Sequence, residues 1–358
     1  MRLIDFGYPT VMPRLVRVSP TAPGLRRVRS GRTFRYVDSH GTRVTDPATL
    51  ERIAALVLPP AWEDVWICTR PNGHLQAVGT DAAGRRQYRY HDAWRVSRDL
   101  EKFEHVLDVG ARLPAVRTVV GEQLAGTDLT REQVLACAVR LLDLGFFRVG
   151  SEQYAAKNGT FGLATLRKDH VKVSRDGVLT FDYIAKSGKQ RVQSLAEPEV
   201  VAVVQSLKLR RGGGPELLAY RSAGRWVDVK SSDINEHLRE LAGIDVTAKD
   251  FRTWSATVLA SVGLAVSADR SSVAARKRAV TRVVHEVSHY LGNTPAVCRS
   301  SYIDPRVIEL FEEGQTVERE LLNLGADVEP GHPATQGSVE AAVLKLLRPG
   351  ATRRTVGV

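Results

Sequence analysis

The feature that most constrains the fold is a change in sequence pattern near residue 98. Before it, short runs rich in β-branched and aromatic residues alternate with turns, as where VWICTR and HLQAVGT flank PNG. After it, apolar residues recur with a helical period, as in REQVLACAVRLLDL, which Thr130 and Gln133 begin as a capping box and Gly145 ends. A chain of 358 residues also exceeds one compact core. We therefore predict an α+β protein with two folded domains.

The predicted domain boundaries follow this pattern. Residues 1–97 form a small β-rich domain, whose first thirty residues read as a flexible basic leader. Residues 98–325 form a larger, mainly helical domain that contains one β-hairpin, VLTFDYIAKSGKQRVQS. Residues 326–358 form a linker, a short helix and a basic tail.

Charge indicates an anionic partner. The net charge is +11, and 40 of the 51 basic residues are arginines, the better bidentate ligands of phosphate. Residues 1–97 carry 15 basic and 8 acidic side chains, whereas the remainder carries 36 and 32, so positive charge is denser in the small domain. This balance fits a nucleic acid, and taken alone it also fits an anionic membrane surface.

The same sequence disfavours several classes of protein. No apolar run approaches the roughly 18 residues of a membrane-spanning helix, and the N-terminus lacks the pattern of a signal peptide, so we expect a cytoplasmic protein. The three cysteines are few and widely spaced, which favours reduced, structural thiols: Cys68, Cys137 and Cys298. The absence of a GxxxxGK[ST] loop argues against a nucleotide-driven enzyme.

The segment His285-Glu286-Val287-Ser288-His289 matches the HExxH pattern of zinc proteases. Two histidines four residues apart on a helix can bind zinc, but such a site needs a third protein ligand. The eleventh position of the longer pattern is Pro295, and no downstream carboxylate is singled out. We therefore expect an ordinary helix and no metal site, with a zinc protease as a less favoured alternative.

Five ordered segments carry a more specific signal. The first is LGNTPAVCRSSY, which contains Tyr302; it predicts one helix ending at Gly292 or Asn293 and another starting at Thr294-Pro295. The others are Leu144–Gly150 (LGFFRVG), Asn158–Gly162 (NGTFG) with the hairpin after it, Lys249–Thr253 (KDFRT) and Gly84–Tyr90 (GRRQYRY). Together they resemble the type IB DNA topoisomerases, in particular the small bacterial and viral branch, over roughly residues 59–312.

The resemblance implies a set of catalytic roles. Tyr302 would be the nucleophile that forms a phosphotyrosine, while Arg148 and Arg252 would stabilise the transition state. Lys186, near the hairpin turn, would be the general acid, with Lys189 as a rival. Asn293 occupies a position where the family usually has a histidine that donates to a phosphate oxygen. Because an amide donates a neutral hydrogen bond, we expect activity with a somewhat slower chemical step.

The resemblance also implies a set of DNA contacts. In the small domain these would come from Arg85, Arg86, Gln87, Tyr88 and Tyr90, and in the large domain from Lys249. Alternation along a strand places Gln87 and Arg89 on one face and the two tyrosines on the other, so packing of the tyrosine pair into the small core is an alternative. The core itself is expected to include Trp62, Trp66 and Trp94.

The sequence thus predicts a DNA topoisomerase that needs neither ATP nor a metal cofactor. It would nick one strand of duplex DNA through a 3′-phosphotyrosyl intermediate, relax positive and negative supercoils, and religate. We expect a cytoplasmic, nucleoid-associated monomer whose domains clamp double-stranded DNA. The alternatives are a tyrosine recombinase and a non-catalytic DNA-binding protein. The recombinase is disfavoured by Lys249 where its second-arginine motif begins with His, and by the β-rich small domain.

Overall fold

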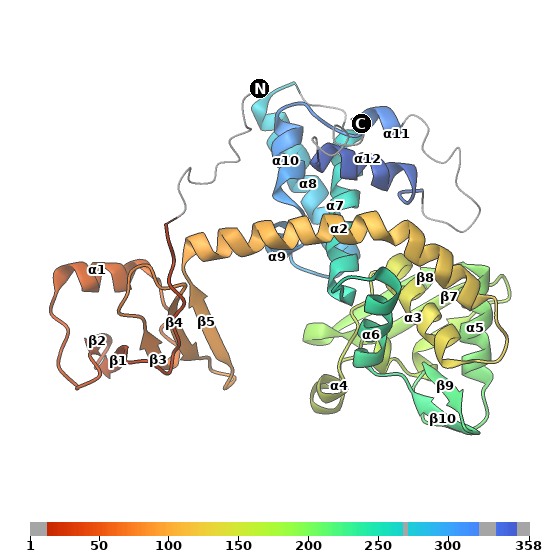
Figure 1. The fold of residues 1–358 in the computed structure, drawn as a ribbon, viewed down its shortest axis with the longest axis horizontal. Coiled ribbons are helices and arrows are strands. Elements are labelled where there is room, and N and C mark those ends of the chain that lie inside the picture. Colours follow the sequence, from red (N-terminus) through yellow and green to blue (C-terminus); the bar gives the residue numbers. More distant parts are fainter. Residues whose placement is uncertain (1–12, 268–270, 322–333, 349–358) are drawn as a thin grey trace, which may run out of the picture. The chain divides into compact units, whose positions relative to one another are not determined.

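The computed structural model describes residues 13–267, 271–321 and 334–348, and divides into two compact units, Met1–Phe103 and Glu104–Val358 (Figure 1). The first unit is built on an antiparallel sheet and the second is mainly helical, so the predicted α+β class is confirmed. Within the described ranges, no helix is both long enough and apolar enough to cross a membrane.

The first unit contains a five-stranded antiparallel sheet of order β2-β1-β3-β4-β5. Its strands are β1 (Leu25–Ser30), β2 (Thr33–Val37), β3 (Glu63–Ile67), β4 (Leu75–Thr80) and β5 (Arg86–Tyr90). Helix α1 (Pro47–Ala55) begins at Asp46, whose carboxylate accepts from the Thr49 amide at 2.9 Å. The small core consists of aliphatic side chains: Leu25, Ile53, Val65, Ile67 and Ala77.

The expectation of a flexible leader is wrong, and that of three tryptophans in the core is met only in part. The leader is ordered sheet over residues 25–30, because β1 pairs with both β2 and β3; residues 1–12 lie outside the described residues. Of the three tryptophans expected in the core, Trp62 is half-buried and packs against it, whereas Trp66 and Trp94 are half-buried and are not part of this cluster.

Helix α2 (Asp92–Leu124) begins in the first unit and continues into the second, starting six residues before the predicted change of pattern. The remaining helices of the second unit are α3 (Arg131–Gly145), α4 (Glu152–Asn158), α5 (Pro198–Leu209), α6 (Ser231–Ala242), α7 (Ala248–Ala265), α8 (Val273–Leu291), α9 (Pro295–Ser301), α10 (Pro305–Glu312), α11 (Glu318–Leu321) and α12 (Ser338–Leu347). Short 3₁₀ turns cover Leu163–Thr165, Lys168–His170 and Lys186–Gly188.

Two small antiparallel sheets complete the second unit. One contains β6 (Val171–Val173), β7 (Leu179–Ala185) and β8 (Lys189–Leu195), and includes the predicted hairpin. The other, β9 (Ala219–Ser222) with β10 (Arg225–Asp228), was not predicted, because its strands are four residues long and mostly exposed. One large apolar core joins α2, α3, α5, α7, α8 and α12 to the face of β7.

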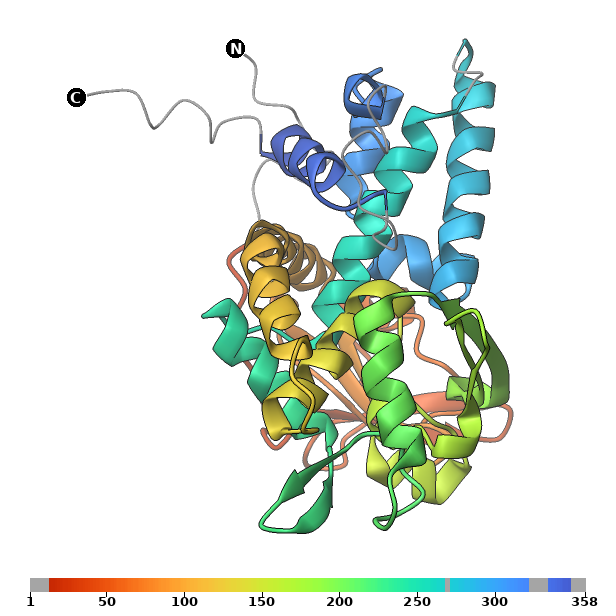
Figure 2. The ribbon, with the colours of Figure 1, turned by 90° about the vertical axis from the view of Figure 1, so that its right-hand side faces the viewer.

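The two helices that matter most for the site, α7 and α8, lie side by side in this core (Figure 2). Helix α3 is buried along almost its whole length. Helix α8 instead buries one apolar face and exposes a polar one, as its 3.6-residue period requires. Arg148, which follows the end of α3, and Lys186, on the β7–β8 turn, line the pocket described next. The C-terminus of α8 lines a neighbouring hollow that these two side chains also border.

Candidate active site

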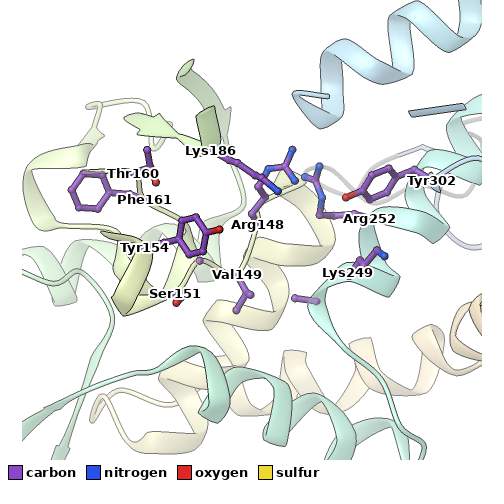
Figure 3. A pocket seen from close by; sticks show the side chains of 12 residues that line it. Arg148, Val149, Ser151, Tyr154, Thr160, Phe161, Lys186, Lys249, Arg252 and Tyr302 are labelled. Atoms are coloured by element: carbon purple, nitrogen blue, oxygen red, sulfur yellow. The ribbon is translucent and has the colours of Figure 1, made fainter. Parts of the chain in front are cut away.

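Four predicted catalytic side chains line one open pocket of about 360 Å³ in the second unit: Arg148, Lys186, Arg252 and Tyr302. Figure 3 shows the Tyr302 hydroxyl directed toward Arg252, with Arg148 and Lys186 on the far side of that arginine. Lys249 lines the same pocket from the first turn of α7. The rest of the wall is contributed by Val149, Gly150, Ser151, Tyr154, Thr160, Phe161 and Ala248.

Arg148 is positioned by the chain just after α3. Phe147 is fully buried and anchors this segment, while the carbonyl of Arg148 accepts from the Leu163 amide at 2.8 Å. Gly150 has φ of +85°, and a Cβ on Gly162 would lie 2.5 Å from its Cα. The LGFFRVG and NGTFG motifs therefore need their second glycines because the two backbones touch.

Lys186 projects from the turn between β7 and β8. Ser187 has φ of +67°, which makes the turn tight, and the side chain of Lys186 is exposed. The Phe161 amide donates to Ile184 at 2.8 Å, so the NGTFG segment ties this hairpin to the Arg148 loop. The rival Lys189 lines only a neighbouring hollow that does not include Tyr302.

Arg252 is buried on the second turn of α7. Its Nη2 donates to the Leu291 carbonyl at 2.7 Å, and its Nη1 donates to the Phe146 carbonyl. Nε is buried and has no hydrogen-bond partner among the described residues. Burial, followed by the nearby charge of Arg148, lowers the pKa of Arg252 to about 10. A phosphate oxygen would supply both the missing acceptor and the opposite charge.

Tyr302 caps the C-terminus of α9 and is only 8% exposed. The guanidinium carbon of Arg252 lies 5.5 Å from its ring centre. Burial acts to raise the pKa of Tyr302, but the charges of Arg252 and Arg148 and their hydrogen bonding to the phenol outweigh it, so the pKa lies below its ordinary value. The phenol is thus prepared to act as an oxygen nucleophile.

Asn293 follows Gly292, whose φ of +62° ends α8. Its Oδ1 accepts from Nη2 of Arg148 at 2.5 Å, which leaves Nδ2 as a buried donor without a partner in the described part of the chain. This arrangement suits donation to an anionic oxygen, although Asn293 borders the neighbouring hollow and not the pocket that contains Tyr302.

Arg191, on β8, is a site residue that sequence reasoning missed. It borders the hollow that also contains Lys186 and Asn293, and its Nη1 donates to the His289 carbonyl at 3.4 Å. Since its partners on α8 are main-chain carbonyls about a hundred positions away, no motif in the sequence signals the contact.

The predicted DNA contacts of the small domain lie on and beside β5. Arg85 is paired with Asp81 at 2.8 Å, and Gln87 donates to the same carboxylate, whereas Arg86 is exposed. Tyr88 is 52% exposed and stacks on Tyr90 at 6.2 Å between ring centres. The alternative in which the pair packs into the small core is therefore wrong.

In the HEVSH segment, Val287 and Ser288 are buried, and the other three side chains lie on the outer face of α8. His285 and His289 are exposed, and Glu286 pairs with Arg282 at 3.8 Å. The described residues include no cluster of three or more His, Cys, Asp or Glu side chains placed to hold a metal ion. They therefore do not provide the third ligand that a zinc protease would require.

Comparisons with known proteins identify two families that match this chain. The family described as "Eukaryotic DNA topoisomerase I, catalytic core" matches residues 91–324, and "Bacterial DNA topoisomerase IB, N-terminal domain" matches residues 33–81. The chain is 29% identical to DNA topoisomerase 1B of Acanthamoeba polyphaga mimivirus over 298 residues, which cover 81% of this chain and 88% of that protein.

Two further relatives are more distant. DNA topoisomerase 1B of vaccinia virus, strain Copenhagen, is 21% identical over 262 residues, or 72% of this chain and 77% of that one. DNA topoisomerase 1 of Daucus carota is 25% identical over 159 residues, 44% of this chain and only 19% of that much longer relative. Because the first family alone spans well over half of the residues, the chain belongs to the type IB DNA topoisomerases and is an enzyme of the isomerase class.

Proposed function

We propose that this topoisomerase nicks one strand of duplex DNA through a 3′-phosphotyrosyl intermediate, permits rotation that relaxes positive and negative supercoils, and then religates. The observation that carries the proposal is the Tyr302 hydroxyl in one pocket with Arg148, Arg252 and Lys186. A nucleophile beside three cations suits a reaction in which negative charge develops on a phosphodiester.

In the proposed cleavage step the phenolic oxygen of Tyr302 attacks phosphorus and gives up its proton to solvent. The P–O bond to the 5′ oxygen breaks, leaving a 3′-phosphotyrosine and a free 5′ hydroxyl. Arg148 and Arg252 donate to the nonbridging oxygens, and Asn293 supplies a further neutral donor through its unpaired Nδ2.

The departing 5′ oxygen must gain a proton during cleavage and lose it during religation. We assign this transfer to Lys186, because its ammonium lies in the pocket that contains Tyr302. Lys189 is the weaker candidate, since it lines only the neighbouring hollow. Religation is the reverse reaction: the 5′ hydroxyl attacks the phosphotyrosine, Lys186 accepts its proton, and the phenol leaves.

The proposal includes no ATP and no metal ion. The energy of the broken phosphodiester is kept in the tyrosyl ester, so religation needs no second substrate. We propose a monomer that grips one duplex with both units, using Lys249 in the second and Arg85, Arg86, Gln87, Tyr88 and Tyr90 in the first. The proposed location is the cytoplasm, with the protein associated with the nucleoid, and the net charge of +11 supports binding to DNA.

The test is a relaxation assay on positively and negatively supercoiled plasmids in the presence of a chelator, paired with denaturant trapping on a nicked duplex. Both plasmids should relax, and peptide mapping should find the 3′ end of the cut strand attached to Tyr302. Tyr302→Phe should abolish the adduct and relaxation. Tyr290→Phe is the matched control, because it removes an exposed phenol nearby and should preserve both.

Two results would overturn the proposal. If Tyr302→Phe relaxes plasmids at the rate of the parent, Tyr302 is not the nucleophile. If relaxation is lost with chelator and restored by a divalent cation, the reaction depends on a metal ion and the metal-free mechanism is wrong.

A further inference from the structure

Arg191 lies where the hairpin that carries Lys186 meets the end of α8. It is half-buried on β8, five residues after Lys186, and opposite Tyr183 in the β7–β8 register. Its Nη1 donates to the His289 carbonyl at 3.4 Å, and its Nη2 donates to the Tyr290 carbonyl. The guanidinium therefore binds the last turn of α8, where free carbonyls concentrate partial negative charge.

Gly292 leaves the space that this contact requires. A Cβ at Gly292 would lie 2.9 Å from Nη1 of Arg191, so a side chain there would displace the guanidinium. Two other guanidinium groups bind the same helix end: Arg252 donates to Leu291 at 2.7 Å and Arg148 donates to Gly292 at 3.2 Å. Arg191 is thus the one member of this arginine trio that comes from the hairpin.

A second contact joins the hairpin to the end of α3. Nε of Arg191 donates to Oε1 of Gln193 at 2.9 Å, and Nε2 of the same Gln193 side chain donates to the Gly145 carbonyl at the end of α3. Arg191 and Gln193 therefore join the hairpin to the segment that leads to Arg148 and to the helix end that leads to Asn293.

The tip of the hairpin depends on such anchors. The last cross-strand pair is Ala185 with Lys189, and the turn beyond it, which bears Lys186, is exposed at all three residues. A small shift of the strands would move the ammonium away from the reacting phosphate, and misplacement of about 1 Å can cost roughly 10²-fold in rate.

We propose that Arg191 is a positioning residue for the general acid: it holds the β7–β8 hairpin against the C-terminus of α8, so that Lys186 stays beside the departing 5′ oxygen. The inference rests on the proposed function. Arg191 acts through Lys186 and not on the phosphate itself, because each of its three nitrogens already donates to a carbonyl group or to Gln193.

A change of leaving group tests this role. In one duplex the scissile bond ends in the ordinary 5′ oxygen; in the other, sulfur replaces that oxygen, so cleavage breaks a P–S bond and releases a thiolate. Because a thiol has a pKa near 8.5, the thiolate leaves without a proton donor. Single-turnover cleavage is measured for both duplexes with the parent, Arg191→Ala, Arg191→Lys and Lys186→Ala.

We expect Arg191→Ala to slow cleavage of the oxygen duplex by roughly 10²-fold and to cleave the sulfur duplex at nearly the parental rate. Arg191→Lys can still donate to one carbonyl, so its rate on the oxygen duplex should lie between those of the parent and Arg191→Ala. The double variant Lys186→Ala, Arg191→Ala should be no slower on the oxygen duplex than Lys186→Ala, because both changes disable one proton transfer. Arg175→Ala removes an exposed arginine between β6 and β7 and should match the parent.

Equal losses on both duplexes would overturn the inference, because Arg191 would then serve the phosphate or the fold. An unchanged rate on the oxygen duplex would overturn it as well. If the parent itself forms no adduct at Tyr302, the proposed function fails, which is a distinct result. Cleavage of the sulfur duplex also reports whether each variant is folded.

Discussion

The phenol of Tyr302 shows how a single side chain is prepared for chemistry by its neighbours. Burial alone would make the phenolate less stable, and it is the largest single influence on the group. Arg252 and Arg148 together exceed that effect, so the pKa falls below the ordinary value of 10.0. The same pair of guanidinium groups that would stabilise the phosphate therefore also favours the attacking anion.

This arrangement predicts a pH dependence. Because a lowered pKa means that the phenol loses its proton earlier as pH rises, the first tyrosinate absorbance in an ultraviolet titration should belong to Tyr302 and be absent from Tyr302→Phe. Arg148→Ala should move this transition to higher pH, since it removes a positive charge that stabilises the phenolate. A titration in which Tyr302→Phe loses no early transition would contradict the electrostatic account.

At the scale of the element, α8 combines a buried apolar face with a strongly basic outer face. Its exposed residues Lys277, Arg278, Thr281, Arg282, His285 and Glu286 border a shallow hollow of about 590 Å³. Nineteen residues at about 1.5 Å each give a helix of roughly 28 Å. Its C-terminus borders the hollow that contains Asn293, beside the pocket that contains Tyr302. A duplex held at the site could therefore meet a row of cations along this helix.

Neutralising that row should weaken DNA binding in a salt-dependent way. We expect the triple variant Lys277→Gln, Arg278→Gln, Arg282→Gln to reduce the slope of log Kd against log salt by about 0.9 for each DNA phosphate that the variant no longer neutralises. The control neutralises three exposed arginines near the β9–β10 hairpin, Arg211, Arg221 and Arg225, and should keep the parental slope. A parental slope for the α8 variant would show that the duplex does not follow this helix.

At this scale, the sequence predicted the features that depend on neighbouring residues and missed those that depend on contacts between distant residues. The start of α3 and the end of α8 were predictable, because Thr130 accepts from the Gln133 amide and Gly292 adopts the left-handed conformation of a C-cap. At the end of α3, Phe146 and not Gly145 adopts that conformation. Strand β1 was missed, since its arginines look like a basic arm until β2 and β3 pair with it. Arg191 was missed for the same kind of reason, because only the folded chain brings α8 to it.

At the scale of the whole molecule, a buried ionic network connects the C-terminal helix α12 to α2, α3 and α7. Glu340 of α12 accepts from Nη1 of Arg117 at 2.5 Å and from the indole of Trp254 at 2.7 Å. Arg117 also donates to Asp143 of α3 at 2.8 Å. Trp254 follows Arg252 by two residues on α7, so the short helix predicted within residues 326–358 supports the helix that carries a predicted catalytic arginine.

Breaking this network should destabilise the second unit. Glu340→Gln keeps an acceptor for Trp254 but removes one of the two carboxylates that pair with Arg117, whose side chain is only 16% exposed. Loss of one partner from a buried ion pair typically costs about 3 kcal/mol or more, and we expect a loss of that size in the free energy of unfolding by urea. Glu122→Gln, an exposed glutamate on α2, should change it by about 0.5 kcal/mol or less. A loss below about 1 kcal/mol for Glu340→Gln would mean that α12 is held by its apolar face, through Val339 and Val343, and that the ionic network adds little.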